Sequence, residues 1–438
     1  MEVDDVGDDY VIVSRGTSPI DAPIAEKDDI SGPKYLAEIG DLIDNLADSL
    51  WPLSNFIHEN PELAYKEYKA HHALTSFMKA QQGWEVTRSA CGMETAWIAV
   101  YDTGEPGPVV SFNAEMDALP QIGHACGHNL IAITSVAAAL ATSSILRTHH
   151  LNGKVLLFGT PGEEGTDGGK IRLLKSGAYK DVDISLISHP GILHNSPMVR
   201  TTAFSRLEVS YHGRASHSAN SPWLAINALD ALVIAYNSIS VLRQQTMPGD
   251  VIAMSIIDGG GPSTNIIHEF ASGACTLRAA TTSRLNSLVN KIKSCFEAGG
   301  LATGAKVEMK QINGYMDHVP NRVLADSYRQ YWEHIPGPKP EIGLPKEGEY
   351  TYIKSSTDQG DISHKIPSVN ASFAIPPGPE KGQPHSRDFE KASGTREAFE
   401  AALRVAKALA GTAVDVLTQD GLLDEVKRQW RKDMEEMG

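Results

Sequence analysis

The 438-residue sequence predicts an α/β fold with a mostly parallel sheet, into which a ferredoxin-like module is inserted. Short, almost continuously apolar segments alternate with helical patterns, as expected for strands that helices cover on both faces. Near the middle of the chain the expected elements instead follow the order βαββαβ, which is typical of the ferredoxin-like layout. The length also exceeds what one hydrophobic core usually serves, so we expect more than one domain.

The main domain is expected to begin at residue 33 with a helical segment. Apolar residues recur there at intervals of three and four as far as Ala80, with a break at Asn60 and Pro61. Strands rich in β-branched residues are expected at 107–114, 154–161, 183–191 and 369–377. Helices are expected at 129–149, at 168–178 and from Ser393 to Leu409.

The inserted module is expected at residues 203–312, so that residues 33–202 and 313–438 form the two parts of the main domain. Its strands are expected at 205–213, 250–260, 271–281 and 305–312, and its helices at 222–245 and 283–300. Residues 1–32 are rich in Asp, Ser, Gly and Pro and show no sustained periodicity. This segment is predicted to be a disordered acidic tail.

Composition excludes several classes of partner. The formal net charge of −15 argues against nucleic acid, because phosphate binding needs clustered Lys and Arg. No stretch approaches the ~20 apolar residues of a membrane helix, and the acidic N-terminus lacks the basic and apolar regions of a secretory signal. The four cysteines show no pairing pattern, which favours a reducing compartment. We therefore expect a cytoplasmic protein without a membrane or nucleic-acid partner.

Side chains that can bind metal follow the ends of the predicted strands. They are Glu115, Asp117, Cys126, His128, Glu163, Glu164, His189 and His385. In open α/β sheets, ligands bind outside the carboxyl ends of the strands, so these segments can converge in space. Thiolate, imidazole and carboxylate groups are the ligands of zinc and related divalent metals. The pattern therefore favours a metal site at this edge.

Each of these signals alone has an ordinary structural explanation. A single His after a strand is usually a hydrogen-bonded structural residue, and a Glu pair is usually a solvated turn. A lone Cys is usually a small buried hydrophobe, the interpretation that we prefer for Cys275 and Cys295. The joint occurrence of the right ligand types favours metal instead. Adjacent glutamates also point opposite ways in an extended chain, so one can bind metal while the other accepts a proton from water and delivers it to a leaving amine.

The ordered motifs resemble those of the aminoacylase/carboxypeptidase metallohydrolases, the M20 peptidases. They are HENPELAYKEYKA (58–70), AEMDALPQIGHACGHNL (114–130), GTPGEEGTDGGK (159–170), ISHPG (187–191), the segment 210–245 with SHSAN, GGGPSTNII (259–267) and STDQGDISH (356–364) followed by His385. Within that family the chain resembles the amidohydrolase branch with indole-acetyl-amino-acid hydrolases and aminobenzoyl-glutamate hydrolase. The sub-branch that includes β-alanyl-lysine dipeptidase is the most similar.

The resemblance implies a hydrolase of amide or peptide bonds with two divalent metal ions per subunit, zinc or manganese. The implied metal ligands are Cys126, His128, Glu164, His189 and His385, with Cys126 replacing a bridging carboxylate. Glu163 would act as the general base on metal-bound water, and Asp117 would orient a histidine ligand. The implied substrates are dipeptides or N-acyl amino acids with a free carboxylate.

The resemblance also implies that the inserted module is a lid and dimerisation domain in a homodimer. There His217 would reach into the partner's site to stabilise the oxyanion, while Asn265 and Arg278 would hold the substrate carboxylate. Several positions depart from the family pattern, among them Gln359 beside Asp358 and Arg387 near His385. Gly162 replaces the Ala of Pro-Ala-Glu-Glu, which we expect to loosen that loop, and His268 replaces the Pro of Asn-Ile-Ile-Pro.

Two other functions remain open on the sequence alone. The same site could serve a biosynthetic or amide-forming step, or the chain could be a non-hydrolytic binding protein. Hydrolysis is favoured because every expected ligand type is present.

Overall fold

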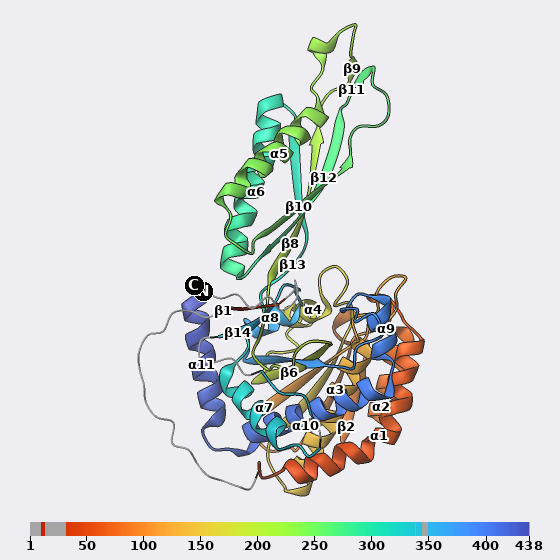
Figure 1. Ribbon diagram of the computed structural model, residues 1–438, viewed down its shortest axis with the longest axis vertical. Helices are drawn as coiled ribbons and strands as arrows, with labels where there is room; N and C mark the ends of the chain where they lie inside the picture. The colour runs from red at the N-terminus through yellow and green to blue at the C-terminus, as the bar shows by residue number, and fades with distance from the viewer. Residues whose placement is uncertain (1–9, 14–31, 338, 344–348, 438) are drawn as a thin grey trace. The chain divides into compact units, whose positions relative to one another are not determined.

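The computed structural model describes residues 10–13, 32–337, 339–343 and 349–437 (Figure 1). The chain divides into two compact units. Unit 1 extends to Arg200 and also contains His318–Lys354 and Asp358–Glu436, whereas unit 2 consists mainly of Thr201–Asp317 with Ser355–Thr357. The predicted tail lies largely outside the described residues. Within it, Tyr10–Val13 form strand β1, where the sequence predicts no element, and this strand pairs antiparallel with β14 (Tyr350–Ile353).

Unit 1 is built on a six-stranded sheet with the order β15-β6-β4-β5-β3-β2. The strands are β15 (Ser368–Ala374), β6 (Ile184–Gly191), β4 (Val109–Glu115), β5 (Lys154–Thr160), β3 (Trp97–Asp102) and β2 (Trp84–Arg88). The first four are parallel, and the last two join antiparallel. The mostly parallel sheet is thus confirmed. Because the four parallel strands run the same way, their carboxyl ends share one edge of the sheet.

Helices surround this sheet (Figure 1). They are α1 (Leu36–Glu59), α2 (Tyr68–Lys79), α3 (His128–Thr148), α4 (Gly169–Lys175), α7 (Arg322–His334), α8 (Gln359–Ser363), α9 (Arg387–Ser393), α10 (Arg396–Thr418) and α11 (Leu422–Met437). The helix expected to start at Ser393 begins instead at Arg396. The Thr395 side chain caps it by accepting a hydrogen bond from the Ala398 N–H, so residues 387–393 form a separate helix. The short strand β7 (Val199–Thr201) joins β14 and β1 in a small sheet.

Helix α3 is the central core helix of unit 1. The helix has 21 residues, and its most apolar 18-residue window has a mean hydropathy of 1.7, so it is long and apolar enough to cross a membrane. The expectation that no stretch approaches such a helix is therefore wrong. However, 94 % of its most apolar window is buried inside the protein, where α3 packs against α1, α10 and β4. The burial explains the composition, since a helix that is apolar all round is typical of a protein core as well as of a membrane.

Unit 2 has the ferredoxin-like layout that the sequence predicts. Its elements are β8 (Ala203–His212), α5 (Ala228–Leu242), β10 (Val251–Asp258), β12 (Phe270–Ala279), α6 (Thr282–Thr303) and β13 (Lys306–Tyr315). The sheet order is β10-β12-β8-β13, with every pair antiparallel, and α5 and α6 lie side by side on it (Figure 1). A two-stranded ribbon of β9 (Ser216–His217) and β11 (Ile266–Ile267) extends the end where β12 begins.

Candidate metal centre

Side chains from the carboxyl ends of the four parallel strands meet in unit 1. Three groups each place their possible ligand atoms within 4.8 Å of one another: Cys126 with His128 and His189, Cys126 with Glu164 and His385, and His128 with Glu163 and Glu164. Cys126 therefore belongs to two of the groups. A sulfur shared in this way lies where one ligand could serve two neighbouring cations.

Local backbone geometry brings these side chains together. Gly127 separates Cys126 from His128 with a φ of +76°, and a Cβ there would lie 2.5 Å from the Pro190 side chain, so only glycine fits. His385 itself has a positive φ of +72°, which is costly for a residue with a side chain. Its backbone N–H donates to the Ala125 carbonyl at 2.8 Å, and this hydrogen bond fixes it beside Cys126.

Two histidines, the buried His128 and the partly buried His189, direct the same ring atom toward the centre. His128 Nδ1 lies 3.1 Å from Asp117 Oδ1, and His189 Nδ1 lies 2.9 Å from the Pro190 carbonyl oxygen. Since these oxygens accept, each Nδ1 carries the hydrogen, and in a neutral ring Nε2 keeps a lone pair. His189 Nε2 faces Cys126 Sγ at 3.3 Å. His128 Nε2 makes no hydrogen bond within the described chain and lies 3.3 Å from Glu115 Oε2. This arrangement is typical of histidine metal ligands.

The charges around His128 favour a cation at the centre. Burial alone would lower the pKa of His128, but the neighbouring Cys126, Asp117 and Glu115 raise it well above its usual value. A positive charge held at this position is therefore stabilised by its surroundings. Burial and the carboxylate of Glu164 raise the pKa of the Cys126 thiol, and a bound divalent cation would reverse that effect.

The pKa values of the adjacent glutamates shift in opposite directions. Burial, followed by the charges of Glu115 and Glu164, raises the pKa of Glu163 well above its usual value. Burial acts in the same direction on Glu164, but its contact with His385, 3.0 Å between Oε1 and Nε2, and the charge of His128 bring the pKa of Glu164 below its usual value. One carboxylate thus suits proton transfer and the other suits a ligand that stays ionised. Asp117 links the two roles, because its Oδ2 accepts the Glu164 N–H at 2.9 Å.

A buried ion-pair network, which the sequence does not predict, lies next to the centre. Lys170 Nζ lies 2.6 Å from Glu115 Oε1 and 2.5 Å from Asp358 Oδ1, and all three residues are buried. Glu115, Glu163 and Asp358 place carboxylate oxygens within 4.8 Å of one another, and the Lys170 ammonium supplies the opposing charge. All four fall inside the motifs quoted above, but the spacing of those motifs does not indicate which residues pair.

The three predicted residues of unit 2 do not form one cluster within the chain. His217 and Asn265 lie together in the β9–β11 ribbon, where the Ser218 N–H donates to the Asn265 carbonyl. Arg278 lies on β12, eight residues after Phe270. At ~3.3 Å per residue, it is about 26 Å from Phe270 along the strand. There its Nη1 donates to Ser356 Oγ at 2.6 Å, and its guanidinium carbon lies 5.0 Å from the centre of the Phe204 ring.

His217 presents a hydrogen-bond donor to its surroundings. Its Nδ1 accepts the backbone N–H groups of Ala219 at 3.2 Å and Asn220 at 3.1 Å. The hydrogen of a neutral ring must then sit on Nε2, and the side chain is exposed. His268, another position that departs from the family pattern, packs over Gly260, where a Cβ would lie 2.3 Å from the His268 side chain.

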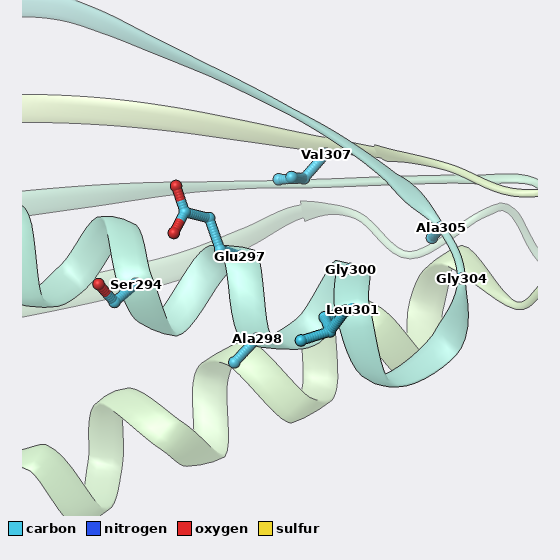
Figure 2. A pocket seen from close by; sticks show the side chains of 8 residues that line it. All are labelled: Ser294, Glu297, Ala298, Gly300, Leu301, Gly304, Ala305 and Val307. Carbon is cyan, nitrogen blue, oxygen red and sulfur yellow. The ribbon is translucent and has the colours of Figure 1, made fainter.

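A pocket elsewhere in unit 2 lacks this chemistry. It has a volume of about 630 Å³ and lies between the end of α6 and the start of β13 (Figure 2). Among its lining residues only Glu297 is ionisable, and Leu301 is exposed to solvent. We therefore place the functional centre in unit 1.

Comparisons with known proteins identify the family of the chain. The Xaa-Arg dipeptidase of Mus musculus is 35 % identical over 435 residues, covering 94 % of this chain and 98 % of its own length. One of the subunits of the p-aminobenzoyl-glutamate hydrolase of Escherichia coli is 25 % identical, covering 88 % of this chain and 91 % of its own. The family model of the peptidase dimerisation domain of M20 proteins matches residues 203–303.

Among solved structures, the YXEP protein of Bacillus subtilis, described as a dinuclear metal-binding peptidase of the M20 family, has a similar fold. Its TM-score is 0.61 at 19 % identity, with 85 % of this chain and 99 % of that chain covered. The full-length match to the mouse dipeptidase, together with the match over unit 2, carries the assignment. The chain belongs to the M20 peptidase family, in its amidohydrolase branch, and is a metallohydrolase of carbon–nitrogen bonds.

Proposed function

We propose that the protein hydrolyses the amide or peptide bond of a small substrate with a free carboxylate, with dipeptides as the first class to test. The observation that carries the proposal is the convergence of Cys126, His128, Glu164, His189 and His385 around the proton-binding Glu163. The mouse relative, named for dipeptides that end in Arg, supports a dipeptide with a basic C-terminal residue. The bacterial relative supports an N-acyl amino acid as the second class.

Two divalent metal ions fit the residues present. His128 Nε2, which makes no hydrogen bond within the described residues but lies 3.3 Å from Glu115 Oε2, the His189 Nε2 lone pair and the Cys126 sulfur common to two ligand groups would hold the ions. A mixed set of sulfur, nitrogen and oxygen donors suits zinc, while the carboxylates also suit manganese. Bound there, the metal ions would polarise the substrate carbonyl and lower the pKa of a water molecule.

The protein's own groups would then move the proton. Glu163 takes it from the attacking water and passes it to the leaving nitrogen, a role supported by its raised pKa. Asp117 holds the His128 ring through Nδ1 and the Glu164 backbone through its N–H, so it orients both neighbours of the reacting atoms.

The molecule would act as a homodimer. Strand β10 lies at one edge of the unit 2 sheet, and its Val251, Ile256 and Ile257 are exposed. An apolar edge strand readily pairs with another chain, and exposed Val233 and Tyr236 on α5 extend the apolar surface. The match to a peptidase dimerisation domain supports pairing with a second copy. In the dimer, His217 would serve the partner's site, and Asn265 and Arg278 would bind the substrate carboxylate.

Replacement of Cys126 by Ala is expected to leave a folded protein with substoichiometric metal and little activity, because both ligand groups lose their shared sulfur. Metal analysis of the dialysed protein measures this. Cys275→Ala is the matched control, since Cys275 is buried in the separate core of unit 2. Unchanged metal content and activity in Cys126→Ala would rule out its role as a ligand.

A substrate panel with and without chelator tests the function itself. Dipeptides with C-terminal Arg, Lys or neutral residues, together with N-acyl amino acids, are incubated with the protein and followed by mass spectrometry. We expect hydrolysis that stops on metal removal and returns with zinc or manganese. Metal binding without turnover of any substrate would contradict hydrolysis and favour a binding protein. Net amide formation from amine and acid would favour the biosynthetic alternative.

A further inference from the structure

The loop that carries Glu163 and Glu164 packs against the segment 64–67, which precedes α2. A Cβ at Gly165 would lie 2.8 Å from Ala64 Cβ and 3.3 Å from the Tyr65 ring. Tyr65 Oη donates to the Thr166 carbonyl at 3.0 Å, and the Arg172 guanidinium carbon lies 5.1 Å from the centre of the Tyr65 ring. Segment 64–67 therefore supports this loop through direct contacts. Neither Tyr65 nor Glu67 belongs to a proposed ligand group.

The Glu67 carboxylate is fully buried and binds three donors from three segments. Oε1 accepts the Tyr65 N–H at 2.8 Å and the Gly162 N–H at 2.9 Å, and Oε2 accepts the Thr95 hydroxyl at 2.6 Å. Gly162 directly precedes Glu163. The Glu67 side chain thus connects the start of the glutamate loop to its support, in a place that water does not reach.

Gly162 fits this support in a way that a larger residue could not. Its φ is +67°, and a Cβ would lie 2.6 Å from the Tyr65 ring. Tyr65 itself has a positive φ of +63°, which turns its ring onto the loop. The expectation that Gly162 loosens the loop is therefore wrong: the glycine permits close contact with the Tyr65 ring and the hydrogen bond to Glu67.

We propose that Tyr65 and Glu67 form a clamp that positions Glu163 and Glu164, so that Glu67 is a positioning residue for the reaction. The roles of the two glutamates rest on the proposed function, but the clamp itself is a property of the fold. Asp117 fixes the loop after Glu163 by accepting the Glu164 N–H, and the clamp fixes it before Glu163 by accepting the Gly162 N–H. Both hydrogen bonds are needed because the two glutamates must face different partners.

Two substitutions at Glu67 separate hydrogen bonding from charge. Burial and the charge of Asp117 raise the pKa of Glu67 to about 7, so a neutral side chain resembles a state that the residue already populates. In Glu67→Gln the amide oxygen can still accept from Tyr65 and Gly162, and its NH₂ group can donate to the Thr95 hydroxyl. Glu67→Ala leaves all three donors without their acceptor.

The test measures metal affinity, hydrogen exchange of the peptide that spans 161–168, and kcat and KM on a dipeptide. In Glu67→Ala we expect faster exchange, zinc affinity weakened by about 10–100-fold, and a lower kcat at saturating metal with KM within about twofold. Glu67→Gln should stay close to wild type in every readout. Tyr68→Phe is the control. Tyr68 follows Glu67 in the chain, and the substitution removes only its exposed hydrogen bond to Glu94.

Gly162→Ala approaches the clamp from the loop side and should reproduce the Glu67→Ala pattern, which keeps the test decisive if Glu67→Ala unfolds. Wild-type exchange and metal affinity in Glu67→Ala or Gly162→Ala would overturn the clamp. Equal impairment in Glu67→Gln and Glu67→Ala would also overturn it, since charge rather than hydrogen-bond geometry would then matter. Exchange and metal affinity are measurable without turnover, so they test the clamp even if the proposed substrates are wrong.

Discussion

Glu163→Gln is expected to bind metal as the wild type does and to lose about 10²–10⁴-fold in kcat, the contribution of a general base. The amide is nearly the same size as the carboxyl group, so the loop and its contact with the Tyr65–Glu67 clamp remain. It cannot accept and return a proton, however. The raised pKa of Glu163, caused first by burial and then by Glu115 and Glu164, is the property that the substitution removes. Metal content and single-turnover kinetics on a dipeptide measure the two effects separately.

Glu164→Gln is the matched control for this experiment. It makes the same chemical change at the adjacent residue. The pKa of Glu164, however, is held low by its contact with His385 and by the charge of His128. We expect this variant to lose metal first and activity as a consequence, with partial recovery at high metal concentration. If Glu163→Gln lost the metal and Glu164→Gln retained it, the two roles would be reversed.

Much of the fold follows from the sequence because its patterns are local. The apolar runs at β4, β5, β6 and β15 are covered on both faces, and that burial produces their continuous hydrophobicity. The βαββαβ order likewise identifies the layout of unit 2. Strand β1 was missed because it pairs with β14, more than 330 residues away, and no local pattern reveals such a partner.

The candidate site was predicted less completely, for a related reason. Ligand types at strand ends can be recognised one by one, and the structure brings the eight predicted residues of unit 1 to a single edge. The supporting residues cannot be recognised in this way. Lys170 is recognisable as a supporting residue only beside Glu115 and Asp358, and Glu67 only beside Gly162. These three contacts span 55, 188 and 95 positions along the chain. Long-range contacts also reversed the expectation for Gly162, whose role depends on the Tyr65 ring.

His217→Ala is expected to form a stable, metal-loaded dimer with kcat reduced by about 10²–10³-fold, the scale for one lost oxyanion donor. The stability follows from the exposure of His217, whose ring accepts hydrogen bonds from the backbone of its own turn. The loss in kcat follows from the removal of the Nε2–H donor of His217. This N–H is directed outward because Nδ1 accepts the backbone N–H groups of the turn. His217→Gln is the informative partner variant, because its amide can still donate a hydrogen bond and should recover part of the rate.

A complementation experiment then asks which site His217 serves. Mixing His217→Ala subunits with Glu163→Gln subunits should restore activity, because a hybrid dimer contains one site with both groups intact if His217 acts across the two-fold axis. With free exchange at equal concentrations, about half of the dimers are hybrids, so roughly a quarter of the wild-type sites should recover. Subunit exchange is verified with a mass-tagged chain before the assay. If the exchanged mixture remains as inactive as its parents, His217 serves the site of its own subunit or no site, and the idea of a site shared between subunits fails.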